Sequence, residues 1–161
     1  MTNLTIRKAV KEDEPFLFEM LYLSLFVPEG GKPFEQSILD NPDISKYVKG
    51  WGREGDTGFI VLMDGEPVGS ITSRFFTEEN KAYGFIDEAI PELSMAIKPA
   101  FRGQGIGSKL LKTMLDELKK NGVRAVSLSV DHRNPAIRLY SRFGFVPVKK
   151  DGPSITMKLD L

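Results

Sequence analysis

The chain has 161 residues, enough for one domain with a single hydrophobic core, so we expect one domain over residues 1–161. Its 22 basic and 22 acidic side chains give zero net charge, which argues against a nucleic-acid partner, and the lack of cysteine excludes disulfides, thiolate nucleophiles and cysteine-ligated metals. No apolar run approaches the ~20 residues of a membrane span, and the N-terminus lacks a signal peptide's apolar segment, so we expect a cytoplasmic protein without a membrane partner.

The first third of the chain predicts one strand and a set of helical segments. Leu4–Arg7 alternates as a short strand does. Asp13-Glu14-Pro15 is typical of a helix start, with a capping carboxylate and a proline in the first turn. Apolar residues then repeat at helical spacing to about residue 26, where prolines and glycines end the helix. Shorter helical pieces are predicted at 34–39 and 44–50.

The rest of the chain predicts six strands and two helices. The long helix is amphipathic from Ile106 to Leu118 and ends at Asn121-Gly122. Asp64-Gly65 and Asp151-Gly152 have the composition of hairpin turns. The predicted strands are 59–63, 67–76, 93–98, 125–130, 145–149 and 154–159, and the helices are 106–118 and 135–143.

The resulting order, βααβββαβαββ, predicts an α+β domain with a mixed, largely antiparallel central sheet flanked by helices. The strand–helix–strand unit from Leu93 to Val130 is expected to form the parallel part of the sheet, because parallel neighbours need a crossover connection.

The strongest functional signal is the turn before the long helix, where Arg102 is followed by Gly103, Gly105 and Gly107. Glycine lets an anion approach the main chain, and a helix start offers unpaired N–H groups at the positive end of the dipole. Arg102 adds a forked cationic donor. The turn therefore predicts a phosphate cradle, with a flexible turn without a ligand as the structural alternative. It is neither a GxxxxGK[ST] loop nor a GxGxxG fingerprint, since its spacing is GxGxG.

The second signal is the segment Asn134-Pro-Ala-Ile-Arg-Leu-Tyr140, followed by Gly144-Phe145. Ala136 and Tyr140 lie four residues apart and share one face of the predicted helix. Tyr140 by itself is open to two interpretations, a core tyrosine whose hydroxyl reaches the edge or a catalytic group.

Together these two segments resemble the GNAT acetyltransferase superfamily. The stretch Arg102-Gly-Gln-Gly-Ile-Gly107 matches that family's R/Q-x-x-G-x-G/A motif, and the second segment matches its N-x-A-x-x-L-Y…GF block. Two motifs in the right order are far more specific than either alone. The resemblance covers roughly Pro91 to Val148, and the N-terminal half is compatible in element order only.

The resemblance implies an N-acetyltransferase that moves the acetyl group of acetyl-CoA directly to a primary amine, without an acyl-enzyme and without a metal. Main-chain amides of the glycine turn would bind the pyrophosphate, a β strand would pair with the pantetheine amides, and an asparagine would hydrogen-bond the pantetheine arm. The implied cofactor contacts are Ala96, Ile97, Arg102, Gly103, Gln104, Gly105, Gly107, Ser108, Asn134, Ala136 and Tyr140.

Amide formation from a thioester needs a neutral amine, a stabilised oxyanion and a protonated leaving thiolate. The resemblance implies that an amide near Met95 to Ile97 polarises the thioester carbonyl and that Tyr140 is the general acid. A tyrosine, with an ordinary pKa of about 10, can donate a proton at neutral pH. Glu92 is the candidate base, although its register differs by about one residue from the family's catalytic glutamate.

Several alternatives stay open. Glu92 is equally interpretable as a solvated charge at a strand end, and Asp87, Glu88 or water could serve as the base; His132 is interpreted as a loop residue. The acceptor, a small-molecule or peptide amine, is not encoded in the motifs, and neither is the choice between monomer and homodimer. An acyl-CoA-binding sensor without turnover, and a nucleotide-binding regulatory domain, are the alternative functions. Candidate acceptor-wall aromatics are Tyr22, Phe26, Tyr47, Trp51, Phe75 and Phe76.

Overall fold

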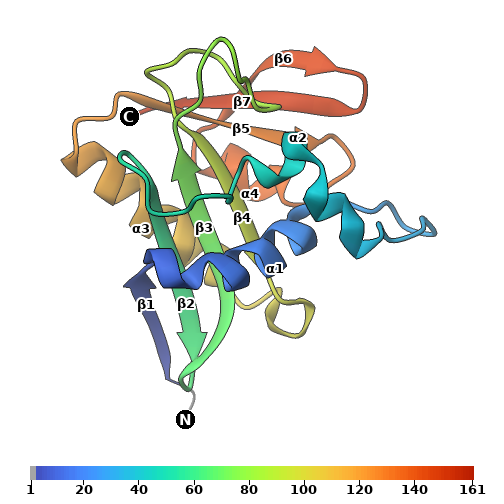
Figure 1. Cartoon of the computed structure of the whole chain (residues 1–161), viewed down its shortest axis with the longest axis vertical. Helices are drawn as coiled ribbons and strands as arrows, with labels where there is room; N and C mark the ends of the chain where they lie inside the picture. Colours follow the sequence, from blue (N-terminus) through green and yellow to red (C-terminus); the bar gives the residue numbers. More distant parts are fainter. Residues whose placement is uncertain (1–2) are drawn as a thin grey trace.

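A computed structural model describes residues 3–161, which form one seven-stranded sheet in the order β1-β2-β3-β4-β5-β7-β6 (Figure 1). The strands are β1 (Leu4–Lys8), β2 (Thr57–Met63), β3 (Glu66–Arg74), β4 (Glu92–Ile97), β5 (Ala125–Asp131), β6 (Val146–Asp151) and β7 (Ser154–Asp160), and the helices are α1 (Glu14–Ser24), α2 (Pro42–Ser45), α3 (Ile106–Lys120) and α4 (Ile137–Arg142). The predicted order βααβββαβαββ is confirmed. As predicted, β4 and β5 are parallel, and the other neighbouring strands are antiparallel.

Two local predictions near the N-terminus are wrong. The Asp13 carboxylate does not cap α1; it accepts from the Val10 N–H at 2.8 Å and pairs with Arg7 at 2.8 Å, which closes a 3-10 turn ahead of the helix. The helix predicted at 44–50 is the four-residue α2, which starts earlier because the Asn41 side chain accepts from the Asp43 N–H at 2.9 Å.

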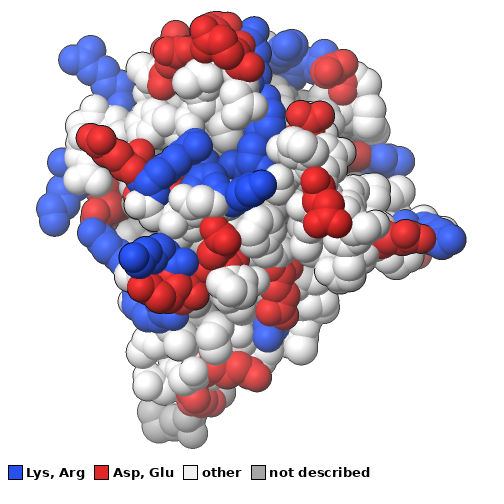
Figure 2. Space-filling model, viewed as in Figure 1, with Lys and Arg blue, Asp and Glu red and all other residues white. Residues whose placement is uncertain are grey.

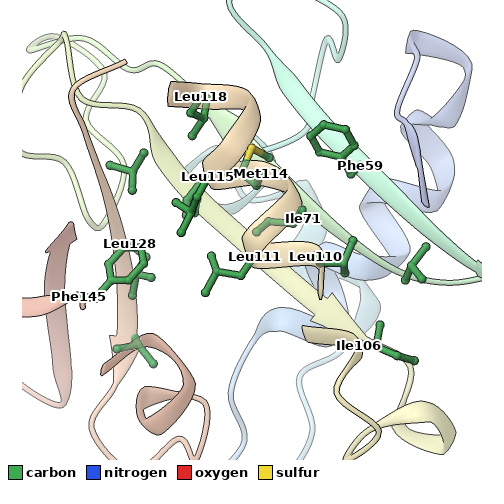
Figure 3. Packing of buried hydrophobic residues seen from close by; sticks show 14 of the residues in the cluster. Phe59, Ile71, Ile106, Leu110, Leu111, Met114, Leu115, Leu118, Leu128 and Phe145 are labelled. Carbon is green, nitrogen blue, oxygen red and sulfur yellow. The ribbon is translucent and has the colours of Figure 1, made fainter. Parts of the chain in front are cut away.

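Two apolar clusters cover the two faces of the sheet. On one face α3 packs its apolar stripe, including Leu110, Leu111 and Met114, against Ile71 and Leu128 (Figure 3). Full burial of each such side chain contributes about 1.5–3 kcal/mol to folding. On the other face α1 and the segment after α2 form the second cluster, and Figure 1 shows α1 crossing in front of the central strands. None of the helices within residues 3–161 has the length and apolar character that crossing a membrane requires.

The strands β4 and β5 are neighbours over a very short distance. Glu92 and Ser127 are their one register pair, whereas β4 stays paired with β3 from Glu92 to Ile97. Beyond Glu92, therefore, β4 has one edge paired with β3 and one edge that β5 leaves open. This gap lies beside the loop that leads into α3, and it positions the candidate site.

Candidate active site

The main-chain groups of β4 alternate between its two neighbours. The Lys98 N–H donates to the Val68 carbonyl on the β3 side at 2.8 Å, and the Pro91 carbonyl accepts from the Ser127 N–H on the β5 side at 3.0 Å. Successive residues of a strand direct their main-chain groups to opposite edges. Odd-numbered residues of β4 therefore face the gap, and even-numbered residues face β3.

This alternation divides the residues predicted to pair with pantetheine. Ile97 faces the gap, where its carbonyl already accepts from Arg102 Nε at 3.0 Å, which leaves its N–H for a ligand. Ala96 faces β3, so its main chain is committed to the sheet and the predicted pairing through Ala96 is wrong. Met95 instead directs both its N–H and its carbonyl to the open edge.

The glycine turn forms an open cradle at the start of α3. Gly103 and Gly105 have positive φ angles of 75° and 79°, and a Cβ on either would meet no atom within 4 Å. Within residues 3–161, the main-chain N–H groups from Gly103 to Ser108 have no hydrogen-bond partner. Six consecutive unpaired donors at the positive end of a 15-residue helix are suited to a diphosphate.

Gly107 differs from the other two glycines of this turn. A Cβ there would lie 3.2 Å from Leu139 Cδ2 and 3.5 Å from Met95 Cε. The missing side chain thus leaves room for α4 and β4 to approach α3, while the Gly107 N–H still belongs to the unpaired set. Its small size serves packing as well as the cradle.

Tyr140 lies on α4, whose Leu139 approaches Gly107, and Asn134 lies in the turn that precedes α4. The Tyr140 ring packs edge-on against Phe145 with 5.8 Å between centroids, and its hydroxyl has no hydrogen-bond partner within the described residues. Burial raises the pKa of Tyr140 to about 12, so the hydroxyl keeps its proton at neutral pH. The Asn134 Oδ1 accepts from the Ala136 N–H at 2.9 Å, which leaves the asparagine NH2 as a donor and only the methyl group of Ala136 for a ligand contact.

Glu92 lies at the point where β4 and β5 diverge, and it is not a solvated strand-end charge. Its side chain is buried, with the residue 2% exposed. Oε1 accepts from the Gly84 N–H at 2.9 Å, and Oε2 accepts from the Tyr47 hydroxyl. Burial raises the pKa of Glu92 to about 7, while the hydrogen bonds from Tyr47 and Gly84 and the charge of Lys46 oppose that rise. A carboxyl group that titrates near neutral pH is suited to proton transfer.

Sequence reasoning missed the partners of Glu92. Tyr47 lies 45 residues upstream, so no local spacing connects the two residues. Gly84 is required because a Cβ there would lie 2.8 Å from the Leu128 carbonyl carbon and 3.0 Å from Glu92 Cδ. The only signal was the aromatic character of Tyr47, which placed it among the acceptor-wall candidates.

The other candidate groups are not brought to this point. The Asp87 and Glu88 carboxylates accept main-chain N–H bonds within an exposed loop. His132 is an exposed loop residue, as predicted. Of the proposed acceptor-wall aromatics, Trp51 and Phe76 belong to the buried core.

Comparisons with known proteins agree with this geometry. The family model described as the Acetyltransferase (GNAT) family matches residues 16–145, and the chain belongs to this family. An uncharacterized N-acetyltransferase of Methanocaldococcus jannaschii is 28% identical over 88% of this chain, which spans 60% of that relative's length. A Bacillus subtilis protein, described as a candidate [ribosomal protein bS18]-alanine N-acetyltransferase, is 27% identical over 91% of this chain and 83% of its own.

Solved structures show the same fold. The PaiA N-acetyltransferase from Thermoplasma acidophilum, solved in complex with coenzyme A, has a TM-score of 0.73 at 20% identity over 99% of both chains. The YncA acetyltransferase of Salmonella typhimurium, solved with acetyl-CoA, has a TM-score of 0.69 at 23% identity over 98% of this chain and 94% of its own.

Proposed function

We propose that residues 1–161 form one catalytic domain that transfers the acetyl group of acetyl-CoA directly to a primary amine in a ternary complex. The observation that carries the proposal is the gap between β4 and β5, with the unpaired amides of α3 beside it and the buried carboxyl of Glu92 at its apex. The family membership and the acetyl-CoA bound in a structural relative support this choice of co-substrate.

The residues around the gap fit the parts of acetyl-CoA. The amides of Gly103, Gln104, Gly105, Gly107 and Ser108, together with the Arg102 side chain, would hold the pyrophosphate. Met95 and Ile97 would pair with the pantetheine amides along the open edge of β4, and the Asn134 NH2 would hold the arm. When bound, acetyl-CoA supplies the acyl group in activated form as a thioester.

Two side chains of the protein then carry out the proton transfers. Glu92 accepts a proton from the attacking amine as the new C–N bond forms, and Tyr140 donates a proton to the sulfur as the C–S bond breaks. An N–H of Met95 or Ile97 would donate to the carbonyl oxygen as negative charge develops there. Solvent then restores the proton of Tyr140 and removes the proton from Glu92.

The surface charge supports a cationic acceptor. Figure 2 shows acidic side chains gathered at the top of the view, where Figure 1 places the β3–β4 connection. That connection carries Glu78, Glu79, Asp87 and Glu88 on its exposed side and reaches Glu92 through Gly84. An amine that is protonated in solution would be attracted to these four acidic side chains. The names of two relatives add the N-terminal alanine of a ribosomal protein to the acceptors worth testing.

The decisive experiment measures CoA release from acetyl-CoA over a panel of amines: N-terminal peptides, lysine, polyamines, amino acids and aminoglycosides. We expect release that depends on one class of acceptor, with initial-rate lines that intersect as a ternary complex requires. Parallel lines would contradict direct transfer. Binding of acetyl-CoA without release for any amine would favour the sensor function instead. The burial of Glu92 favours catalysis over a sensor, because burying a carboxyl group costs stability and holding acetyl-CoA does not require one.

A further inference from the structure

We propose that Tyr47 is a positioning residue that keeps the Glu92 carboxylate ionised and fixed at the apex of the β4–β5 gap. This inference rests on the proposed function, in which Glu92 is the base. It concerns a residue outside both sequence motifs, on the segment that follows α2.

The hydrogen bonds around the Tyr47 hydroxyl leave it one choice of acceptor. Its oxygen accepts from the Tyr83 N–H at 3.0 Å, and its proton goes to Oε2 of Glu92. The Gly84 N–H donates to Oε1 at 2.9 Å. An ionised carboxylate can accept both hydrogen bonds. A protonated carboxyl group carries a hydrogen on one of its two oxygens, and that hydrogen would face the hydrogen donated by Tyr47 or by Gly84. The arrangement therefore favours the ionised form.

No other side chain of the described residues hydrogen-bonds to Glu92. Arg74 is its register partner on β3, but that guanidinium is engaged with Asp56 at 2.8 Å. Lys46, beside Tyr47, favours ionisation through its charge, while its Nζ donates to the Lys81 carbonyl at 2.8 Å.

Among the described residues, Lys46 is the only charge that influences the pKa of Glu92. Ser127, its partner on β5, is uncharged, and the β3–β4 connection contributes the main-chain amide of Gly84. Burial raises the pKa of Glu92, and the Tyr47 hydrogen bond is the largest influence that opposes it.

The fold holds the Tyr47 ring in place from two sides. Arg74 Nη1 donates to the carbonyls of Lys46 at 2.9 Å and Lys49 at 2.7 Å, which bracket Tyr47 in the chain. The ring also packs edge-on against Phe76 with 5.5 Å between centroids. Because the Tyr47 side chain is buried and held from two sides, its hydroxyl is aimed at Glu92 before any substrate arrives.

The test is the pH dependence of kcat/KM in Tyr47→Phe, which keeps the ring and removes the hydroxyl. Because this variant loses a hydrogen bond to a charged group, the acidic limb of its pH profile of kcat/KM should lie about one to two pH units higher than in wild type. At pH 7 kcat/KM should fall by about 5- to 50-fold, as a shift of one to two units from a pKa of about 7 requires, and it should recover above the new limb. Tyr83→Phe is the matched control, because the Tyr83 ring is exposed and only the main-chain N–H of this residue takes part in the hydrogen bonds. The acidic limb of the Tyr83→Phe pH profile should therefore stay where it is in wild type.

A double-mutant cycle separates positioning from simple packing. In a Glu92→Gln background, Tyr47→Phe should cause no further loss of kcat/KM, since the residue acts through Glu92. Additive losses, or an unmoved acidic limb in folded Tyr47→Phe, would overturn the inference.

A measurement without turnover keeps this inference distinct from the proposed function. In wild type, carbon NMR should show the Glu92 carboxyl and Tyr47 Cζ titrating with one shared midpoint, and Glu92→Gln should abolish the Tyr47 transition. A shared midpoint with no amine acetylated would leave the Tyr47–Glu92 coupling intact and overturn the proposed function. If the Tyr47 Cζ shift does not change as Glu92 titrates, the coupling is overturned. This outcome holds even if the enzyme is active, and it does not depend on whether Tyr47→Phe folds.

Discussion

Arg74 and Glu92 are register partners on neighbouring strands, yet Arg74 pairs with Asp56 at 2.8 Å rather than with Glu92. A guanidinium bonded to Glu92 would hold the pKa of that carboxyl below its ordinary range. Instead, the direct hydrogen-bond donors are a tyrosine hydroxyl and a main-chain amide. Glu92 is therefore left able to gain and lose a proton near neutral pH, as a base must.

Glu92→Gln should lower kcat/KM by about 10²–10⁴-fold and remove the acidic limb of the pH profile near pH 7. The substitution keeps the shape of the side chain and removes its ability to take a proton. The check is a pH series of kcat/KM with an accepted amine. An unchanged limb in Glu92→Gln would assign that limb to another group, and Glu92 would then be a structural residue.

The same carboxyl group makes a prediction about stability. Its pKa in the folded protein is about 7, above the ordinary value of 4.5, so the folded state binds this proton more tightly than the unfolded state does. The stabilisation is fully present below pH 4.5 and is lost as the pH rises through 7, at most about 3 kcal/mol. Urea unfolding at pH 5 and pH 8 should show wild type losing more stability than Glu92→Gln. Equal losses in both proteins would contradict the assigned titration.

Gly105→Ala should weaken acetyl-CoA binding by about tenfold or more, a change of about 1.4 kcal/mol. Its Cβ would enter the open space that a diphosphate would occupy. The matched control is Gly122→Ala at the other end of α3, which has φ 81° against 79° and equally open surroundings. Both substitutions put a side chain on a left-handed residue, so the two variants should have similar melting temperatures. Calorimetry should find weakened acetyl-CoA binding in Gly105→Ala and not in Gly122→Ala. Equal affinities would place the cradle elsewhere.

Gly107→Val should act mainly on folding. The new side chain would press on Leu139 and Met95, and overpacking typically costs about 1–3 kcal/mol. Leu139→Ala in the same chain should restore part of that loss by making room. Thermal unfolding of the two single variants and the double variant checks this. Strictly additive losses would mean that Leu139 is not the residue in contact.

Tyr140→Phe should lower kcat by about 10²–10⁴-fold with little change in acetyl-CoA affinity. Its hydroxyl bonds to no described residue, so removing it should cost less than the roughly 1 kcal/mol of a lost hydrogen bond. The comparison needs a confirmed acceptor and chemistry shown to be rate-limiting. A kcat within about threefold of wild type would make Tyr140 a packing residue, because general acid catalysis is worth far more than that.

The order of elements and the parallel unit were predictable because hydrophobic period, turn residues and crossover rules are local properties of the sequence. The cradle glycines were predictable for the same reason. The direction of the β4 main chain was not: whether Ala96 or Met95 faces the gap depends on the register with β3. The environment of Glu92 was also hidden, since it is built by Tyr47, Gly84 and Arg74 from three separate segments.

The single register pair between β4 and β5 makes the sheet two panels joined at a seam, with β1 to β4 on one side and β5, β7 and β6 on the other. A bound pantetheine chain that pairs with Met95 and Ile97 would occupy the position of a missing strand at this seam. Cofactor binding would then also complete the sheet. The two panels would therefore be joined more strongly when acetyl-CoA is bound than when it is absent.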